Sequence, residues 1–266
     1  MDLTLKIICT PSLRSSLRRL VEYLEGDFFD RLLLPFPEAL NPLLIKFING
    51  EESFDELLEE ASGKGCILEP TGYFKYLYEP LIRAMPILKR RLPRLDITCY
   101  RDSESIAKMN ELAVHKASLT LYTAINGKVK IREWRGLFEE ELKSDTASIH
   151  EAVNNIIRSY NPFSHVICAA HLEGRHLYER LRGRIRSISL KYMGLPYFYT
   201  PLEALKRLIS IKGLSGVTDE AIEEGVKLHV GYVRDYVIPS KELDMGYLRW
   251  LIKNFKIGDL HAKHIV

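Results

Sequence analysis

The segment HVICAAHLEG, residues 165–174, decides the fold, because an apolar run leads directly into polar residues at its end. Such a run of β-branched and small apolar residues is typical of a strand that is buried on both faces. The same arrangement occurs in LTLKIICTPS (3–12), GCILEPTGY (65–73) and DITCYRDSES (96–105), each followed by a pattern with helical period. Strand, polar turn and helix, repeated along a chain, predict an α/β fold with a mostly parallel central sheet flanked by helices.

The remaining sequence sets the size of the sheet and the division into domains. Apolar runs at 31–34 and 184–190 bring the expected sheet to about five or six strands. Residues 200–254 predict three further helices and no strand. We therefore expect an α/β core domain at 1–195 and a C-terminal helical extension at 196–266 that packs on the core.

Composition excludes several classes of protein. The 266 residues include 38 basic and 35 acidic side chains, a net charge of +3, which is too balanced to indicate nucleic acid or membrane by itself. No apolar run reaches the roughly 18–20 residues of a membrane span. A strand begins almost at the first residue, so we expect no signal peptide and a cytoplasmic protein. The absence of glutamine is typical of thermophile proteins.

The four cysteines lie in the apolar segments, at positions 9, 66, 99 and 168, and form no C-x-x-C pair. This spacing argues against zinc fingers and iron–sulfur clusters, and predicts reduced, buried thiols. The chain also contains no G-x-G-x-x-G, Walker, G-x-S-x-G or H-E-x-x-H motif. Nucleotide-binding, serine-hydrolase and zincin classes therefore have no motif to support them.

Polar side chains follow each predicted strand, and ligands of open parallel sheets bind at the carboxyl ends of the strands. A histidine at such a position, as His171 is, suits a metal ligand or a general base. Glu173 lies near the start of the next helix, where the helix dipole favours a carboxylate. The alternative is that Glu173 caps this helix and His171 hydrogen-bonds a neighbouring loop.

Arg101 and Asp102 end another predicted strand. As a paired cation and anion they could orient His171 or hold a substrate carboxylate or phosphate. The alternative for Asp102 is a helix N-cap. Thr10 and Ser12 could donate hydrogen bonds to an anion at a helix N-terminus, although Ser12 is also well placed as an N-cap.

Two glutamates complete the set of candidates near the strand ends. Glu69 ends its own predicted strand, and Glu79 lies on the helix that leads into the strand at 95–100. The ordinary role for both is an exposed ion pair.

A basic stripe follows His171 and could bind a phosphate backbone. Its alternative is a solvated face that Glu173 and Glu179 partly neutralise. The stripe consists of Arg175, Arg180, Arg182, Arg184, Arg186 and Lys191.

VICAAHLEG (166–174) resembles the strand and Gly-x-x-His-type turn of the TraB/PrgY/Tiki group of α/β domains, which is related to the ChaN and erythromycin-esterase families. Tyr78-Glu79-Pro80 followed by a strand ending in Arg101-Asp102 is similar to the helix glutamate and Asp-Arg-like pair of that group. The resemblance covers roughly residues 3–190. The histidine that normally ends the first strand of the group is absent from Cys9–Ser15.

The resemblance implies a metal-assisted hydrolase, in which His171, Glu79 and Glu173 bind a divalent metal (Mn, Zn or Co). It assigns Arg101 and Asp102 to orientation and substrate binding. Because the N-terminal histidine is missing, the alternative is a non-catalytic binding or scaffold protein, which contacts nucleic acid through residues 175–191 or binds a protein partner or a second copy of itself.

Overall fold

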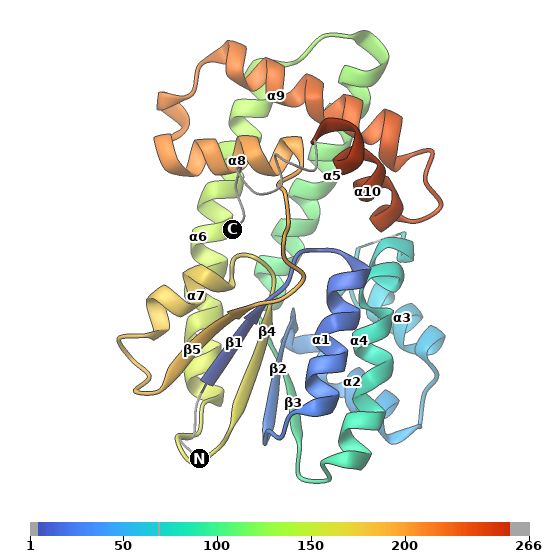
Figure 1. The fold of residues 1–266 in the computed structure, drawn as a ribbon, viewed down its shortest axis with the longest axis vertical. Coiled ribbons are helices and arrows are strands. Elements are labelled where there is room, and N and C mark those ends of the chain that lie inside the picture. The colour runs from blue at the N-terminus through green and yellow to red at the C-terminus, as the bar shows by residue number, and fades with distance from the viewer. Residues whose placement is uncertain (1–4, 69, 256–266) are drawn as a thin grey trace. The chain divides into compact units, whose positions relative to one another are not determined.

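Five strands form a single sheet in the order β3-β2-β4-β1-β5, and every neighbouring pair is parallel. This confirms the α/β fold predicted from the sequence. The computed structural model describes residues 5–68 and 70–255, and Figure 1 shows their arrangement. The strands are β1 (Leu5–Cys9), β2 (Arg31–Pro37), β3 (Asp96–Arg101), β4 (Val166–Ala170) and β5 (Ile188–Tyr192).

Successive side chains of the strands point to opposite faces of the sheet, and they belong to two separate apolar cores, one on each face. On the first face, Ile8 and Ile167 pack with four helices. On the second face, Ile7 and Cys168 pack with α6 (Ile131–Ser159) and α7 (Gly174–Leu181). Because both faces of the sheet are covered, β2 and β4 are apolar over most of their length, whereas the edge strand β5 alternates between half-buried and exposed residues. The helices of the first face are α1 (Arg14–Gly26), α2 (Asn41–Asn49), α3 (Phe54–Gly63) and α4 (Gly72–Arg91).

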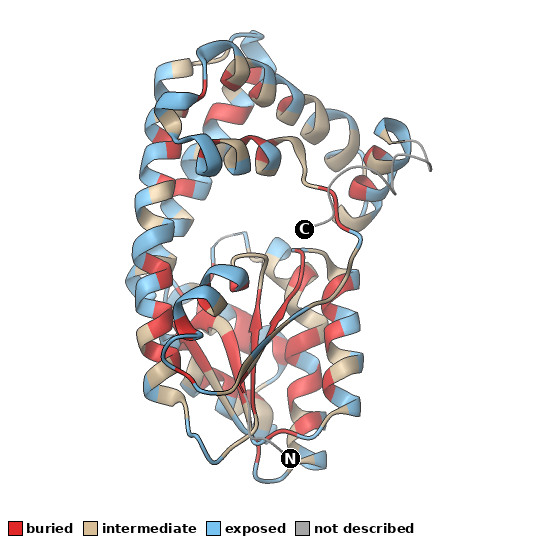
Figure 2. Ribbon diagram, turned by 60° about the vertical axis from the view of Figure 1, so that its left-hand side comes forward, coloured by how far each residue is buried: buried red, intermediate tan, exposed pale blue. Residues whose placement is uncertain are grey.

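Buried positions follow the same pattern in the drawing. In the part of the molecule that holds the sheet, buried residues occupy the strands and the helix sides that face them (Figure 2). The capping box that begins α3 also follows the sequence, since Ser53 accepts a hydrogen bond from the Glu56 amide and Glu56 accepts one from the Ser53 amide.

The chain divides into two compact units that each combine two stretches of sequence. Unit 1 holds the sheet and comprises Met1–Asn110 and Thr146–Leu195. Unit 2 comprises Glu111–Asp145 and Pro196–Val266. The sequence-based division placed a limit after residue 195, where unit 1 also ends. It did not include the grouping of residues 111–145 with the C-terminal part.

Unit 2 is helical in its described residues. It includes residues 111–126 of α5 (Ser103–Asn126) and residues 131–145 of α6. It also includes α8 (Pro201–Lys212), α9 (Asp219–Tyr232) and α10 (Leu243–Asn254). The core of unit 2 joins the two stretches, because Trp134 and Phe138 of α6 share one apolar cluster with residues of α8 and α9.

One predicted strand is wrong. Residues 65–68 form a turn between α3 and α4, although Cys66 and Ile67 are buried. The Cys66 amide donates to the Ala61 carbonyl, so the backbone of this turn closes α3 and does not pair with a strand. Glu69, a predicted substrate-binding residue, lies outside the described residues. Among the described helices, none combines the length and the apolar character that crossing a membrane requires.

Candidate functional site

The carboxyl ends of β1 and β4 lie side by side at the point where the chain leaves the sheet in opposite directions. After β1 the chain continues to α1 on one face, and after β4 it continues to α7 on the other face. Such a switch point leaves a crevice at the carboxyl ends, which is the usual ligand site of open α/β sheets. Thr10 and Ser12 follow β1, and His171 and Glu173 follow β4, so the four residues meet at this position.

His171 has a hydrogen-bonding neighbour at each ring nitrogen. Its Nδ1 lies 3.4 Å from the Oγ of Ser12, and its Nε2 lies 2.5 Å from the Oη of Tyr78. Ser12 is exposed, whereas Tyr78 is half-buried against Phe36 and Phe74, with both ring centroids 4.8 Å away. The imidazole is therefore held between a fixed phenol and an accessible hydroxyl.

Arg101 anchors the turn that carries His171. Its side chain is buried, and the guanidinium donates to Glu173 Oε1 at 2.6 Å and to Ser148 Oγ at 2.8 Å. Because Glu173 follows His171 by two residues, this pair fixes the turn from the β3 side of the sheet. The predicted helix-cap role of Glu173 is wrong, since its side chain makes no capping hydrogen bond to α7.

Burial and the neighbouring charges set the protonation states of the site. Burial lowers the pKa of His171. Glu173 opposes this effect, Arg101 adds to it, and a hydrogen bond between the imidazole and the Thr10 backbone also opposes it. Burial alone would raise the pKa of Glu173, but Arg101 and His171 outweigh burial and leave this pKa below its usual value. Burial raises the pKa of Tyr78 well above its usual value. Near neutral pH the site therefore holds a neutral imidazole, a neutral phenol, a carboxylate and a guanidinium.

The local chain geometry brings the two strand ends close together. The Thr10 amide donates to the Ala170 carbonyl at 2.9 Å, so the ladder between β1 and β4 extends one step beyond the strands. Gly174 then lets α7 approach the sheet, since a Cβ at this position would lie 2.5 Å from Cys9 Sγ and 2.8 Å from the Cβ of Ala170. No residue with a side chain fits here without movement of β1 or β4.

The loop after β5 also closes against this end of the sheet. The Met193 amide donates to the Cys9 carbonyl at 2.9 Å. Gly194 follows with φ +81°, a left-handed backbone, and a Cβ there would collide with Ser16 and lie 3.2 Å from Pro11 Cδ. The backbone of this loop thus borders the turn that carries Ser12.

Ser12 does not cap α1, contrary to one of its two predicted roles. The N-cap position is Leu13, and no side chain caps the helix. Asp102, in contrast, has the capping role that was its alternative, because its Oδ1 accepts the Ser105 amide at 2.7 Å. The structure shows no hydrogen bond from Asp102 to His171, so the predicted orienting role of Asp102 has no contact to support it.

The three predicted metal ligands, His171, Glu173 and Glu79, do not form one site. Glu79 is held by Arg14 at 2.8 Å and by Arg83 at 2.9 Å, and these hydrogen bonds lower its pKa. A carboxylate that is already neutralised by two guanidinium groups is a poor metal ligand. Within residues 5–68 and 70–255, no group of three His, Cys, Asp or Glu side chains is placed to hold a metal ion. The residues present thus do not fit the metal that the resemblance implied.

The basic stripe separates into different environments. Arg175 forms an ion pair with Glu179 at 3.0 Å, and Lys191 lies over the ring of Tyr23 with its Nζ 4.0 Å from the centroid. The other members are exposed, and no ion pair forms at them within the described part of the chain. They are Arg180, Arg182, Arg184 and Arg186.

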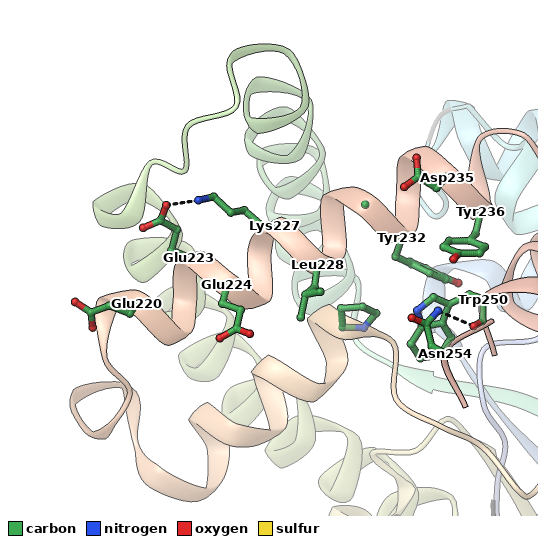
Figure 3. A pocket seen from close by; sticks show the side chains of 12 residues that line it. Glu220, Glu223, Glu224, Lys227, Leu228, Tyr232, Asp235, Tyr236, Trp250 and Asn254 are labelled. Atoms are coloured by element: carbon green, nitrogen blue, oxygen red, sulfur yellow. Dashed lines mark hydrogen bonds and ion pairs between the residues drawn. The ribbon is translucent and has the colours of Figure 1, made fainter. Parts of the chain in front are cut away.

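Unit 2 contains a pocket of about 620 Å³ that the sequence did not predict. Tyr232, Tyr236 and Trp250 gather at one end of it, and the carboxylates of Glu220 and Glu224 lie toward the other end (Figure 3). Its lining includes no histidine, serine or cysteine.

Tyr78 and Ser148 are the site residues that sequence reasoning missed. Tyr78 directly precedes the candidate Glu79 on α4, and the helical turn directs it to His171 while Glu79 faces Arg14. The only signal was its place beside Glu79. Ser148 lies in the middle of α6, where a serine carries no pattern that indicates a partner on β3.

Comparisons with protein family models, with curated proteins and with solved structures found no match to this chain. The class of protein is therefore defined by the fold and by the residues at the switch point alone: an α/β protein with an imidazole, a hydroxyl and a phenol at the carboxyl ends of β1 and β4.

Proposed function

We propose that unit 1 hydrolyses an ester or another activated acyl bond, with Ser12 as nucleophile and His171 as general base. The observation that carries the proposal is the chain from Ser12 Oγ through both nitrogens of His171 to Tyr78 Oη. A nucleophile next to a base, with a third group orienting the base, is the arrangement of covalent acyl-transfer catalysis. The 3.4 Å separation is within the range of sites without substrate, in which these hydrogen bonds are often long.

In this mechanism Nδ1 of His171 takes the proton of the Ser12 hydroxyl while Oγ attacks the acyl carbon. The mechanism uses the tautomer in which Nε2 carries the ring proton and donates a hydrogen bond to Tyr78 Oη. The imidazolium then gives its proton to the leaving alkoxide, and a water activated by the same Nδ1 hydrolyses the acyl-serine. A base of this kind must be neutral, and burial, by lowering the pKa of His171, keeps it neutral.

The N-terminus of α1 would stabilise the negative charge that develops on the acyl oxygen. Ser12 lies two residues before Arg14, the first residue of α1, and the first turn of this helix carries no acidic residue. The partial positive charge of a helix N-terminus stabilises an oxyanion placed there. Arg101 and Glu173 act as positioning residues, since they hold the turn that carries His171 without facing Ser12.

The proposal retains the hydrolase class implied by the resemblance and omits the metal step. Glu79 is occupied by two arginines, so it supplies no ligand beside His171. Hydrolysis by Ser12 and His171 uses groups that the structure brings together and needs no divalent ion.

Hydrolysis of p-nitrophenyl acetate and of longer-chain p-nitrophenyl esters by the purified protein tests the proposal. We expect Ser12→Ala to abolish turnover above the rate of the free imidazole, and His171→Ala to lower kcat by about 10²–10⁴-fold, the usual contribution of a general base. Ser15→Ala is the matched control, because Ser15 is also exposed and lies on the same segment. Equal rates for Ser12→Ala, Ser15→Ala and the unchanged protein would rule out Ser12 as nucleophile.

A further inference from the structure

The opposite edge of the sheet, at the amino ends of the strands, carries a second surface with its own chemistry. The registers align Asp96, Arg31, Val166, Leu5 and Ile188 in one row across the five strands. At about 4.8 Å per strand this row is roughly 19 Å long. Figure 1 shows the amino ends of the strands together at the lower side of the drawing.

Hydrogen bonds join the loops that precede these strands into one fixed edge. The Asp30 amide donates to the His165 carbonyl at 2.8 Å, and the His165 amide donates to Asp30 Oδ2 at 2.7 Å. The Asp96 amide donates to the Asp30 carbonyl, and the Leu5 amide donates to the Ser187 carbonyl. Side chains on these loops therefore keep a constant spacing.

Two phenylalanines on this edge, Phe28 and Phe163, have side chains that are mostly exposed to solvent. Phe163 is 82% exposed, and its turn is held by the Asn161 side chain, which accepts the Phe163 amide at 3.0 Å. Phe28 is 70% exposed, and the Arg91 guanidinium lies 5.5 Å from its ring centroid. Large rings held out into solvent on rigid turns are features of binding surfaces.

Arg91 lies beside Phe28, and two acidic residues of the same edge are engaged in ion pairs. Asp96 pairs with Arg31 at 2.8 Å, and Asp27 pairs with Lys6 at 3.1 Å. The exposed arginines on the loops before β3 and β5 form no ion pair with any described residue, which leaves this edge positively charged. We call the following set the basic edge: Phe28, Arg94, Phe163, Arg182, Arg184 and Arg186.

We propose that the basic edge binds single-stranded nucleic acid, with the arginines on phosphates and Phe163 stacked on a base. Arg94 precedes β3, and Arg182, Arg184 and Arg186 precede β5, so cations lie at both ends of an edge that is roughly 19 Å long. Phosphates of an extended strand can reach both ends, and guanidinium groups bind phosphate through paired hydrogen bonds. Stacking on exposed rings is how proteins hold unpaired bases. An anionic membrane would require a broader apolar face than two separate rings supply. This surface is independent of the hydrolase site at the other edge.

Fluorescence anisotropy of a labelled 15-nucleotide RNA of mixed sequence tests the proposal with the full chain. The variant Arg182→Ala/Arg184→Ala/Arg186→Ala is expected to bind roughly tenfold or more weakly, and to reduce the slope of log K against log salt by about 2, since each phosphate contact contributes roughly 0.7 on a single strand. The matched control is Arg18→Ala/Arg19→Ala/Lys128→Ala, which removes the same charge from exposed residues that do not belong to the basic edge. Its affinity should stay within about twofold of the unchanged protein.

Phe163→Ala is expected to weaken RNA binding by about five- to 150-fold, the usual effect of one stacked base, whereas Phe163→Tyr retains the ring and the affinity. Equal losses in both triple variants would overturn the proposal, because binding would then depend on net charge alone. Absence of RNA binding at low salt would also overturn it. So would binding to vesicles of phosphatidylglycerol and phosphatidylcholine without RNA binding, which would identify a membrane surface.

Discussion

At the scale of single residues, the protonation of His171 controls the proposed reaction. The general base works only when Nδ1 is unprotonated, so kcat/KM should rise with pH and then level off. Burial lowers the pKa of His171, which places the midpoint of this rise below 6.5, the usual value. A pH–rate profile measures it directly. A midpoint above 6.5, or a rate that is flat across pH 4–8, would contradict a buried neutral base.

Arg101 is expected to matter for stability as well as for position. Arg101→Met removes the partner of Glu173 and should lower the free energy of unfolding by about 2–3 kcal/mol. This is less than the roughly 3–5 kcal/mol of fully buried pairs, because the Glu173 side chain keeps 28% of its surface exposed. Urea denaturation at pH 7 measures the loss. Adding Glu173→Gln should recover part of it, since no unpaired charge then remains.

The same pair gives the stability a defined pH dependence. The pKa of folded Glu173 lies below its usual 4.5, so the carboxylate stabilises the fold above that pH and loses this contribution as the pH falls through the folded pKa. The difference between the unchanged protein and Glu173→Gln should therefore shrink below about pH 4.5. A difference that stays constant from pH 7 to pH 3 would show that the charge of Glu173 contributes nothing.

The site residues that could be predicted from the sequence are those at, or directly after, the end of a strand. His171, Glu173 and Arg101 lie where a parallel sheet places its ligand groups, and the structure brings them together. Ser12 was predicted at this edge as an anion donor or cap, whereas the structure sets it beside His171. That contact depends on the order of the strands, which no local pattern contains.

At the scale of elements, Gly174 decides how closely α7 packs on β1 and β4. Gly174→Ala places a methyl group 2.5 Å from Cys9 Sγ and should lower the free energy of unfolding by about 1–3 kcal/mol. Gly183→Ala is the control, since a Cβ at Gly183 meets no atom within 4 Å. Thermal unfolding of both variants measures the effect. Equal melting temperatures would show that α7 can move away without cost.

The apolar runs predicted all five strands of the sheet, the inner strands and the two edge strands alike. The runs at 3–9, 31–34, 95–100 and 164–170 all contain strands, and the last strand lies at 188–192, within and just beyond the predicted 184–190. The run at 65–68 has similar composition and buries Cys66 and Ile67, but the Cys66 amide donates to the Ala61 carbonyl at the end of α3 and not to a strand. Burial alone therefore does not separate a strand from a buried turn.

At the scale of the whole molecule, the grouping of residues 111–145 with the C-terminal part has a consequence for truncation. A chain that ends at Leu195 would leave Trp134, Leu137 and Phe138 without the α8 and α9 residues of their cluster. We expect this truncated chain to aggregate or to bind an apolar dye.

Replacing residues 111–145 by a short glycine linker in the same truncated chain should restore a monomer. Lys116 and Glu141 form an ion pair between α5 and α6, so these two helices run side by side and a short linker can join them. Size-exclusion chromatography of the two truncated chains, with and without residues 111–145, distinguishes a monomer from an aggregate. A monomeric chain with residues 111–145 retained would contradict the division.

The sequence predicted the α/β class and the limit near residue 195, because periodicity and composition change there. It did not predict that residues 111–145, which belong to α5 and α6, form part of the second unit. The apolar residues of 111–145 could pack on the sheet or on the C-terminal helices. Only their contacts with α8 and α9 show that they belong to unit 2.

The central claim is that Ser12 is a nucleophile activated by His171. Its most direct test is labelling of the full chain with a fluorophosphonate, followed by peptide mass spectrometry. The account predicts a single adduct on the peptide that contains Ser12, and its loss in His171→Ala. No adduct, or one on another serine that persists in His171→Ala, would contradict it.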